Sequence, residues 1–462
     1  MVKKIRINRT KQTTFNKLRV GLLSLASLLA LAFALPTSHA KSKQLPQINL
    51  SSGLATPVME AGKNQNAFIR VALTGFEIDR ESQRTPLNVA IVLDQSSSMS
   101  GQKIRRAKEA ANMAVRQLNN NDVISIITYD STVDVLVPAT KATDKQALYR
   151  AIRRIKARGN TALFAGTSKG AYEVRKFLSD KRVNRVVLLS DGMANVGPSS
   201  PSDLGGLGRA LAKDGMSVST IGLGLGYNED LMTQLANYSD GNHSFVENSA
   251  DLARVFEKEF GEASSVVAQD VDIQIILEKG IKPIRIVGRD GDIVGNKVFT
   301  RMNQIYSQQE SYVVLEVNIP AGQVGEDKSI ANVSVNYNHM LANRRLELAD
   351  AVSASFTASK EEVKESINKP VYEAAIEQVA NERSKEAIEL RDKGDIVGAQ
   401  QKLKQNSSLF SRAANYISSD KLSEKSLEAD EDAESVQAPG ADWNKKRKEL
   451  KAKSYKLEKQ QR

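Results

Sequence analysis

The 462-residue chain contains no cysteine, only three histidines and few aromatic residues, which make up 5% of the chain and include a single tryptophan. The absence of cysteine excludes disulfides, thiolate metal sites, cysteine nucleophiles and cysteine-linked lipid anchors. So few histidines leave little for imidazole catalysis or a zinc site. Apolar residues are 41% and charged residues 26% of the chain, which is enough to bury hydrophobic cores and excludes wholesale disorder.

The amino-terminal segment differs in charge from the rest of the chain. Seven of the 65 lysine and arginine residues, and none of the 54 acidic ones, precede an uncharged apolar run that ends before Pro36. The small-residue sequence Ser38-His39-Ala40 follows. This order predicts a secretory signal peptide at residues 1–40, with an uncleaved anchor helix as the alternative.

Beyond residue 40 the net charge falls to +4, which does not indicate nucleic-acid binding. No later apolar run reaches the roughly 18 residues of a membrane-spanning helix. Export of a cysteine-free chain is typical of the bacterial envelope, so we expect a periplasmic or a secreted, cell-surface protein.

The pattern of apolar residues divides the remaining chain into five parts. Residues 85–262 alternate strands with amphipathic helices, which predicts an α/β domain with a mostly parallel sheet. Residues 41–84 and 263–359 contain only strands, and we expect them to form one antiparallel β-sandwich into which the α/β domain is inserted. Residues 360–420 predict a helical hairpin, with a packing role favoured over peptide binding. Residues 421–462 are charged and lack a compact apolar set, which predicts a mostly disordered tail or a solvated helix.

Hydroxyl and carboxylate side chains follow the predicted strands of the α/β domain, at the edge where open sheets bind ligands. A D-x-S-x-S motif formed by Asp94, Ser96 and Ser98 follows the first strand, Thr161 precedes a helix, and Asp191 follows a later strand. Such residues are also ordinary in turns and helix caps. Three loops nevertheless offer only hard oxygen ligands, which suit Mg²⁺, with Ca²⁺ or Mn²⁺ as alternatives, and count against zinc or copper.

The balance of charge in this set favours a role in binding. Three of the five side chains are neutral hydroxyls. If these supply the oxygens and the two carboxylates act partly through water, a bound dication is under-neutralised and keeps an open coordination position. A carboxylate from a partner protein would complete its shell. The set therefore predicts a metal-bridged clasp for the Asp or Glu residues of a partner.

The complete set resembles the metal-ion-dependent adhesion site of von Willebrand factor type A domains, and the stretches 219–224, 227–232 and 239–242 are similar to bacterial members of that family. The flanking segments resemble those of exported bacterial proteins described as calcium-activated chloride channel-like. The resemblance implies a Rossmann-like domain over residues 85–262 that binds proteins through a divalent cation, with Asp94, Ser96, Ser98, Thr161 and Asp191 as metal ligands. It also implies that the last helix of the domain, residues 249–260, shifts when ligand binds.

Other functions fit the sequence less well. A catalytic triad needs a histidine, and His243 and His339, which follow the predicted signal peptide, lie in no nucleophile motif. A metal-assisted hydrolase needs a general base, and none accompanies the candidate site in the sequence. The glycine-rich stretch 222–226 lacks the Lys-Ser/Thr pair of a phosphate loop. A channel would need membrane-spanning segments, and the sequence after residue 40 contains none. We therefore expect no enzyme.

A periplasmic assembly or maturation factor would use the same metal site as an adhesin. The basic residues 445–462 could associate with the envelope, although a solvated tail is the simpler interpretation.

The sequence Asp290-Gly291-Asp292 lacks the continuation of an EF-hand, so we interpret it as a turn between strands.

Overall fold

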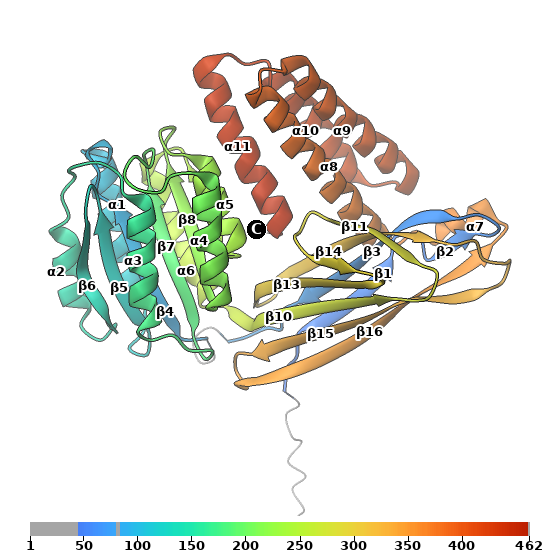
Figure 1. The fold of residues 1–462 in the computed structure, drawn as a ribbon, viewed down its shortest axis with the longest axis horizontal. Helices are drawn as coiled ribbons and strands as arrows, with labels where there is room; N and C mark the ends of the chain where they lie inside the picture. The colour runs from blue at the N-terminus through green and yellow to red at the C-terminus, as the bar shows by residue number, and fades with distance from the viewer. Residues whose placement is uncertain (1–44, 80–83, 461–462) are drawn as a thin grey trace, which may run out of the picture. The chain divides into compact units, whose positions relative to one another are not determined.

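The computed structural model describes residues 45–79 and 84–460, so the predicted signal peptide lies outside the described residues. This part of the chain forms an α/β domain, two mainly antiparallel sheets and a set of carboxyl-terminal helices (Figure 1). None of the helices in the described ranges combines the length and the hydropathy that a bilayer span requires.

The α/β domain is built on a six-stranded sheet in the order β6-β5-β4-β7-β8-β9, in which β6 alone runs antiparallel. Strands β4, β5, β7 and β8 are buried along their whole length because helices cover both faces, with α1, α2 and α6 on one face and α3, α4 and α5 on the other. The strands are β4 (Leu87–Asp94), β5 (Val123–Tyr129), β6 (Val133–Lys141), β7 (Val183–Ser190), β8 (Met216–Leu223) and β9 (His243–Val246). The helices are η1 (Ser97–Met99), α1 (Gln102–Gln117), α2 (Lys145–Arg153), α3 (Leu163–Arg175), α4 (Pro201–Lys213), α5 (Glu229–Tyr238), η2 (Ser249–Asp251) and α6 (Leu252–Ala263).

The other two sheets form one β-sandwich, because a single hydrophobic core lies between them. Their strand orders are β1-β3-β14-β11 and β12-β13-β10-β15-β16-β2. Strand β3 comes before the α/β domain and β14 after it, yet the two pair antiparallel, with Val71 opposite Val313. The α/β domain is therefore inserted into the sandwich. The sandwich is antiparallel except for one pair, because β2 runs parallel to β16. The strands are β1 (Asn49–Leu54), β2 (Val58–Glu60), β3 (Gln65–Thr74), β10 (Val266–Leu277), β11 (Lys282–Val287), β12 (Asp292–Val294), β13 (Lys297–Tyr306), β14 (Glu310–Ile319), β15 (Asp327–His339) and β16 (Arg344–Thr357).

The carboxyl-terminal part is helical. After α7 (Lys360–Glu365), the expected hairpin consists of α8 (Lys369–Asp392) and α9 (Ile396–Ile417). The sequence predicts a mostly disordered tail or a solvated helix for residues 421–462, but the described ones form two helices that are packed. Helix α10 (Asp420–Ser435) packs on α9, and α11 (Gly440–Lys459) packs on α8 and the α/β domain. The apolar pattern missed α11 because the helix buries charged side chains, Lys448 and Glu458, against ion-pair partners in other elements.

Candidate metal centre

Three loops at the carboxyl ends of parallel strands bring the five predicted ligands together. Asp94 is the last residue of β4, and Ser96 and Ser98 lie in the turn that contains η1. Asp191 directly follows β7, and Thr161 precedes α3. Strands β4 and β7 are hydrogen-bonded neighbours, so their ends meet at one edge of the sheet.

Hydrogen bonds connect four of the five residues. The Ser98 hydroxyl donates to Oδ1 of Asp191 at 2.6 Å and lies 2.9 Å from the Oγ atom of Ser96. Oδ1 of Asp94 accepts the backbone N–H of Ser96 at 2.8 Å. The Ser190 hydroxyl holds the other oxygen of Asp94, Oδ2, at 2.8 Å. The two carboxylates are therefore fixed in place by the turns that carry the serines.

Gly192 brings the fifth residue, Thr161, into the same group. A Cβ atom added at Gly192 would lie 3.3 Å from Oγ of Ser98 and 3.4 Å from Oγ1 of Thr161, so both hydroxyls face the space that the glycine leaves. The backbone N–H of Thr161 is held by Oδ1 of Asn195 at 2.8 Å. Hydroxyl and carboxylate oxygens thus converge here, the donor set that Mg²⁺ prefers, and the residues fit that cation.

Burial shapes the electrostatics of this group. Asp94, Ser96, Thr161 and Asp191 are buried, whereas Ser98 is exposed. Burial raises the pKa of Asp94, although hydrogen bonds from Ser96 and Ser190 act in the opposite direction. No group of three or more His, Asp or Glu side chains in the described part of the chain is arranged to hold a metal. A cation at this edge would therefore depend on the hydroxyls as well as on the two carboxylates.

Lys103 is a member of this group that the sequence analysis missed. It lies in the first turn of α1, and its Nζ atom is 2.5 Å from Oδ2 of Asp191. The lysine side chain is 36% exposed, whereas the aspartate side chain is completely buried. A lysine five positions after a serine motif carries no signal of its own in the sequence, because the direction of a long side chain is set by the fold.

The loop between β8 and α5 borders the same edge. A Cβ atom added at Gly226 would lie 2.8 Å from the backbone oxygen of Asp191, so the loop can approach this closely only with glycine there. Helix α11 contacts this loop, because Nζ of Lys448 donates to the backbone oxygen of Tyr227 at 2.8 Å and Asn444 donates to that of Leu225 at 3.4 Å. This contact could not be predicted from the sequence, because it depends on the packing of α11.

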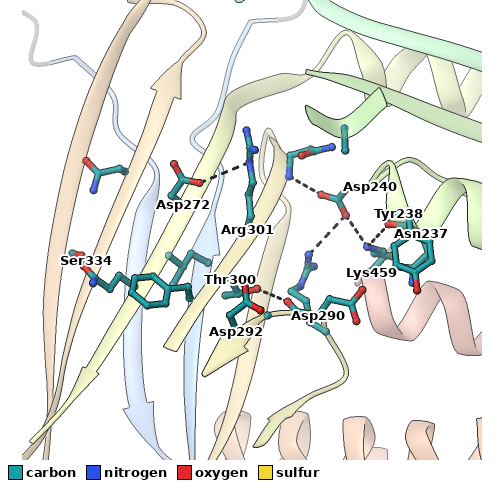
Figure 2. Close-up of a pocket in the computed structure, with 18 residues that line it drawn as sticks. Asn237, Tyr238, Asp240, Asp272, Asp290, Asp292, Thr300, Arg301, Ser334 and Lys459 are labelled. Atoms are coloured by element: carbon teal, nitrogen blue, oxygen red, sulfur yellow. Dashed lines mark hydrogen bonds and ion pairs between the residues drawn. The ribbon is translucent and has the colours of Figure 1, made fainter. Parts of the chain in front are cut away.

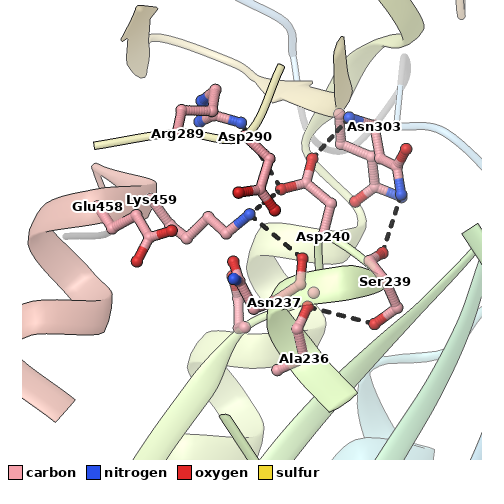
Figure 3. Close-up of polar contacts among 12 residues, drawn as sticks. Ala236, Asn237, Ser239, Asp240, Arg289, Asp290, Asn303, Glu458 and Lys459 are labelled. Carbon is pink, nitrogen blue, oxygen red and sulfur yellow. Dashed lines mark hydrogen bonds and ion pairs between the residues drawn. The ribbon is translucent and has the colours of Figure 1, made fainter. Parts of the chain in front are cut away.

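A separate cavity of about 840 Å³ lies between the α/β domain, the sandwich and the end of α11 (Figure 2). None of the five predicted metal ligands lines it. At its edge, Asp240 accepts hydrogen bonds from Lys459 at 2.8 Å and from the backbone N–H of Asn303 at 2.6 Å (Figure 3). Asp290 belongs to the lining and lies between β11 and β12, as expected for a turn. These contacts tie three parts of the chain to one another.

Residues 88–258 match the family model of the von Willebrand factor type A domain. The chain contains a von Willebrand factor type A domain. Such a domain is typically a protein-binding module. The match covers the six-stranded sheet and most of α6, and it includes all five predicted metal ligands.

Two curated proteins are similar to part of this chain. "Uncharacterized protein sll0103" from Synechocystis is 30% identical over 221 residues, which are 48% of this chain and 52% of that protein. "Uncharacterized protein YfbK" from Escherichia coli is 28% identical over 200 residues, which are 43% of this chain and 35% of that protein. The matched part thus spans only about half, or about a third, of each relative.

A solved structure extends the likeness in fold beyond this domain. The von Willebrand factor type A protein from Catenulispora acidiphila superposes with a TM-score of 0.65 at 16% identity, over 80% of this chain and 87% of that one. A likeness at this identity shows the fold alone. It extends well beyond residues 88–258, so a comparable arrangement of type A domain and flanking parts exists in another protein.

Proposed function

We propose that the chain is an exported, non-enzymatic binding module that captures Asp or Glu side chains of a partner protein through a divalent cation. The cation is Mg²⁺, with Ca²⁺ or Mn²⁺ as alternatives, and its ligands are Asp94, Ser96, Ser98, Thr161 and Asp191. The observation that supports this proposal most is the meeting of these five oxygen-bearing side chains at one edge of the sheet, around the space beside Gly192.

The surroundings of the group suit a protein partner. Ser98 is its exposed member, so the partner's carboxylate reaches the cation from this side. Two exposed apolar side chains lie in loops that border the site. Met193 follows Asp191 by two residues and is 57% exposed, and Leu225 precedes Gly226 and is 38% exposed. The site therefore combines a polar centre with some exposed apolar area, both of which occur in protein-binding surfaces.

The resemblance to calcium-activated chloride channel-like proteins stays a prediction. The proposal has two forms, a cell-surface adhesin and a periplasmic assembly or maturation factor. Affinity capture from envelope extract, with Mg²⁺ and with EDTA in parallel, separates them. An adhesin should retain surface or matrix polymers, whereas an assembly factor should retain one or two envelope proteins. Capture that is insensitive to EDTA would contradict the metal bridge.

The first test concerns the ligands themselves. The substitution Asp94→Ala removes one of the two carboxylates of the site. Mg²⁺ binding, measured by isothermal titration calorimetry, should therefore be lost, and Mg²⁺-dependent capture of the partner should be lost as well. The matched control is Asp180→Ala, an exposed aspartate of the same domain that should leave both unchanged. Circular dichroism melts show whether each variant is folded. An Asp94→Ala variant with unaltered Mg²⁺ affinity would refute the ligand assignment.

A further inference from the structure

The position of Lys103 is electrostatically unusual. A lysine in the first turn of a helix lies at the positive end of the helix dipole, where acidic side chains are favoured. Within the described helix α1, the first turn contains no acidic residue to offset it. What holds the ammonium group is Asp191, whose Oδ2 atom lies 2.5 Å from Nζ.

This ion pair reaches the candidate metal centre directly. The second oxygen of the same carboxylate, Oδ1, accepts the Ser98 hydroxyl at 2.6 Å. Asp191 therefore faces the other metal candidates with one oxygen and the ammonium group with the other. The loop after β8 passes the same lysine, because a Cβ atom added at Gly224 would lie 4.0 Å from both Cε and Nζ of Lys103.

The charges show what the lysine changes. Asp94 and Asp191 carry two negative charges, and Lys103 reduces the net charge of the group to −1. A bound dication then leaves the group at +1, and a single incoming carboxylate brings it to zero. Without the lysine, the metal-loaded group would already be neutral before a partner arrives.

We infer that Lys103 is a positioning and specificity-determining residue, which weakens metal binding in the absence of an anion and makes the metal-loaded protein select a carboxylate. The inference rests on the proposed function and adds a direction to it. Binding of the cation and binding of the partner's carboxylate support each other, because each offsets charge that the other brings. Lys103 carries the fixed positive charge on which this coupling depends.

The test is an Mg²⁺ titration of the full chain by isothermal calorimetry, in chloride buffer and in acetate buffer, with acetate as the carboxylate probe. Lys103→Gln should bind Mg²⁺ about tenfold more tightly in chloride, the size that Coulomb's law gives for one charge beside a dication in a screened site. Acetate should increase the Mg²⁺ affinity of the wild-type chain and have less effect on Lys103→Gln. Lys103→Arg keeps the charge and should behave like the wild type.

The matched control is Lys108→Gln, on the same helix and with similar burial, whose ammonium group contacts the backbone oxygen of Arg153 instead. It should leave the Mg²⁺ affinity unchanged. If the wild type binds Mg²⁺ and Lys103→Gln binds it no more tightly, the inference about Lys103 is refuted and the proposed function stands. If neither protein binds Mg²⁺, the inference and the proposed function are both refuted.

Discussion

Arg185 carries a guanidinium group into the interior, where its side chain is only 1% exposed. The residue lies in β7 and donates to Oε1 of Glu259 in α6 at 2.7 Å. It also donates to the hydroxyl of Tyr306 at 2.7 Å and to the side chain of Gln304, both in β13. One buried charge thus connects the central sheet, the last helix of the type A domain and the sandwich.

Replacing Arg185→Met should destabilise the protein by about 3–5 kcal/mol, because Glu259 would remain buried without its counter-charge. Urea unfolding followed by circular dichroism measures the change. The control, Arg175→Met, removes an ion pair with Asp214 whose two side chains are 45% and 40% exposed, and should cost about 1 kcal/mol or less. The double variant Arg185→Met/Glu259→Met should recover part of the loss. Equal stability of Arg185→Met and the wild type would contradict this account of the pair.

At the scale of single elements, β9 and α11 meet around His243. Nδ1 of its ring lies 2.8 Å from the hydroxyl of Thr220, whereas Nε2 is buried and has no hydrogen-bond partner among the described residues. The ring of Tyr455 in α11 meets the histidine edge-on, with ring centres 5.7 Å apart. The contact between strand and helix therefore requires a neutral imidazole.

This requirement gives the fold a pH dependence. Burial first, and then the positive charges of Lys448, Lys456 and Lys451, lower the pKa of His243 from 6.5 to about 3. The unfolded chain therefore binds a proton at this residue below pH 6.5, whereas the folded chain does so only near pH 3. The stabilising contribution is complete above pH 6.5 and is lost progressively as the pH falls towards 3.

Urea unfolding at pH 7.5 and at pH 5.0 measures this contribution. The wild type should lose about 2 kcal/mol more than the His243→Phe variant over this interval, because 1.5 pH units below 6.5 correspond to about that free energy. Other groups also titrate here, so the difference between the two proteins is the informative quantity. A wild type and variant with the same loss would show that His243 does not titrate as described.

The elements differ in how far the sequence could predict them. Strands such as β4 and helices such as α1 follow from apolar periodicity, because they bury apolar side chains at regular spacing. The five candidate ligands could be placed at one edge of the sheet because short side chains in the turns after β4 and β7, or directly before a helix, have little freedom in where they point. Lys103 and Lys448 could not, since long charged side chains reach partners that only the tertiary structure brings near.

At the scale of the whole molecule, α11 links the carboxyl-terminal helices to the candidate metal centre. Lys448 is 2% exposed, pairs with Glu229 at the start of α5, and donates to the backbone oxygen of Tyr227. Gly226, one residue earlier, lies against the backbone of Asp191. A continuous path of contacts therefore runs from the last described helix, through the loop after β8, to the backbone of Asp191, one of the two acidic residues of the candidate site.

This path predicts that a change in α11 loosens the loop as well as the helix. Lys448→Gln removes the charge that pairs with Glu229 and shortens the side chain that holds Tyr227, so amide hydrogen exchange should become faster in residues 440–459 and in residues 224–228. Lys445→Gln serves as the control, because Lys445 lies on the same helix and makes an ion pair with Glu247 in which the side chains are 43% and 54% exposed. The control should leave both segments unchanged. Faster exchange confined to the helix would mean that α11 is anchored to the type A domain without supporting the loop beside Asp191.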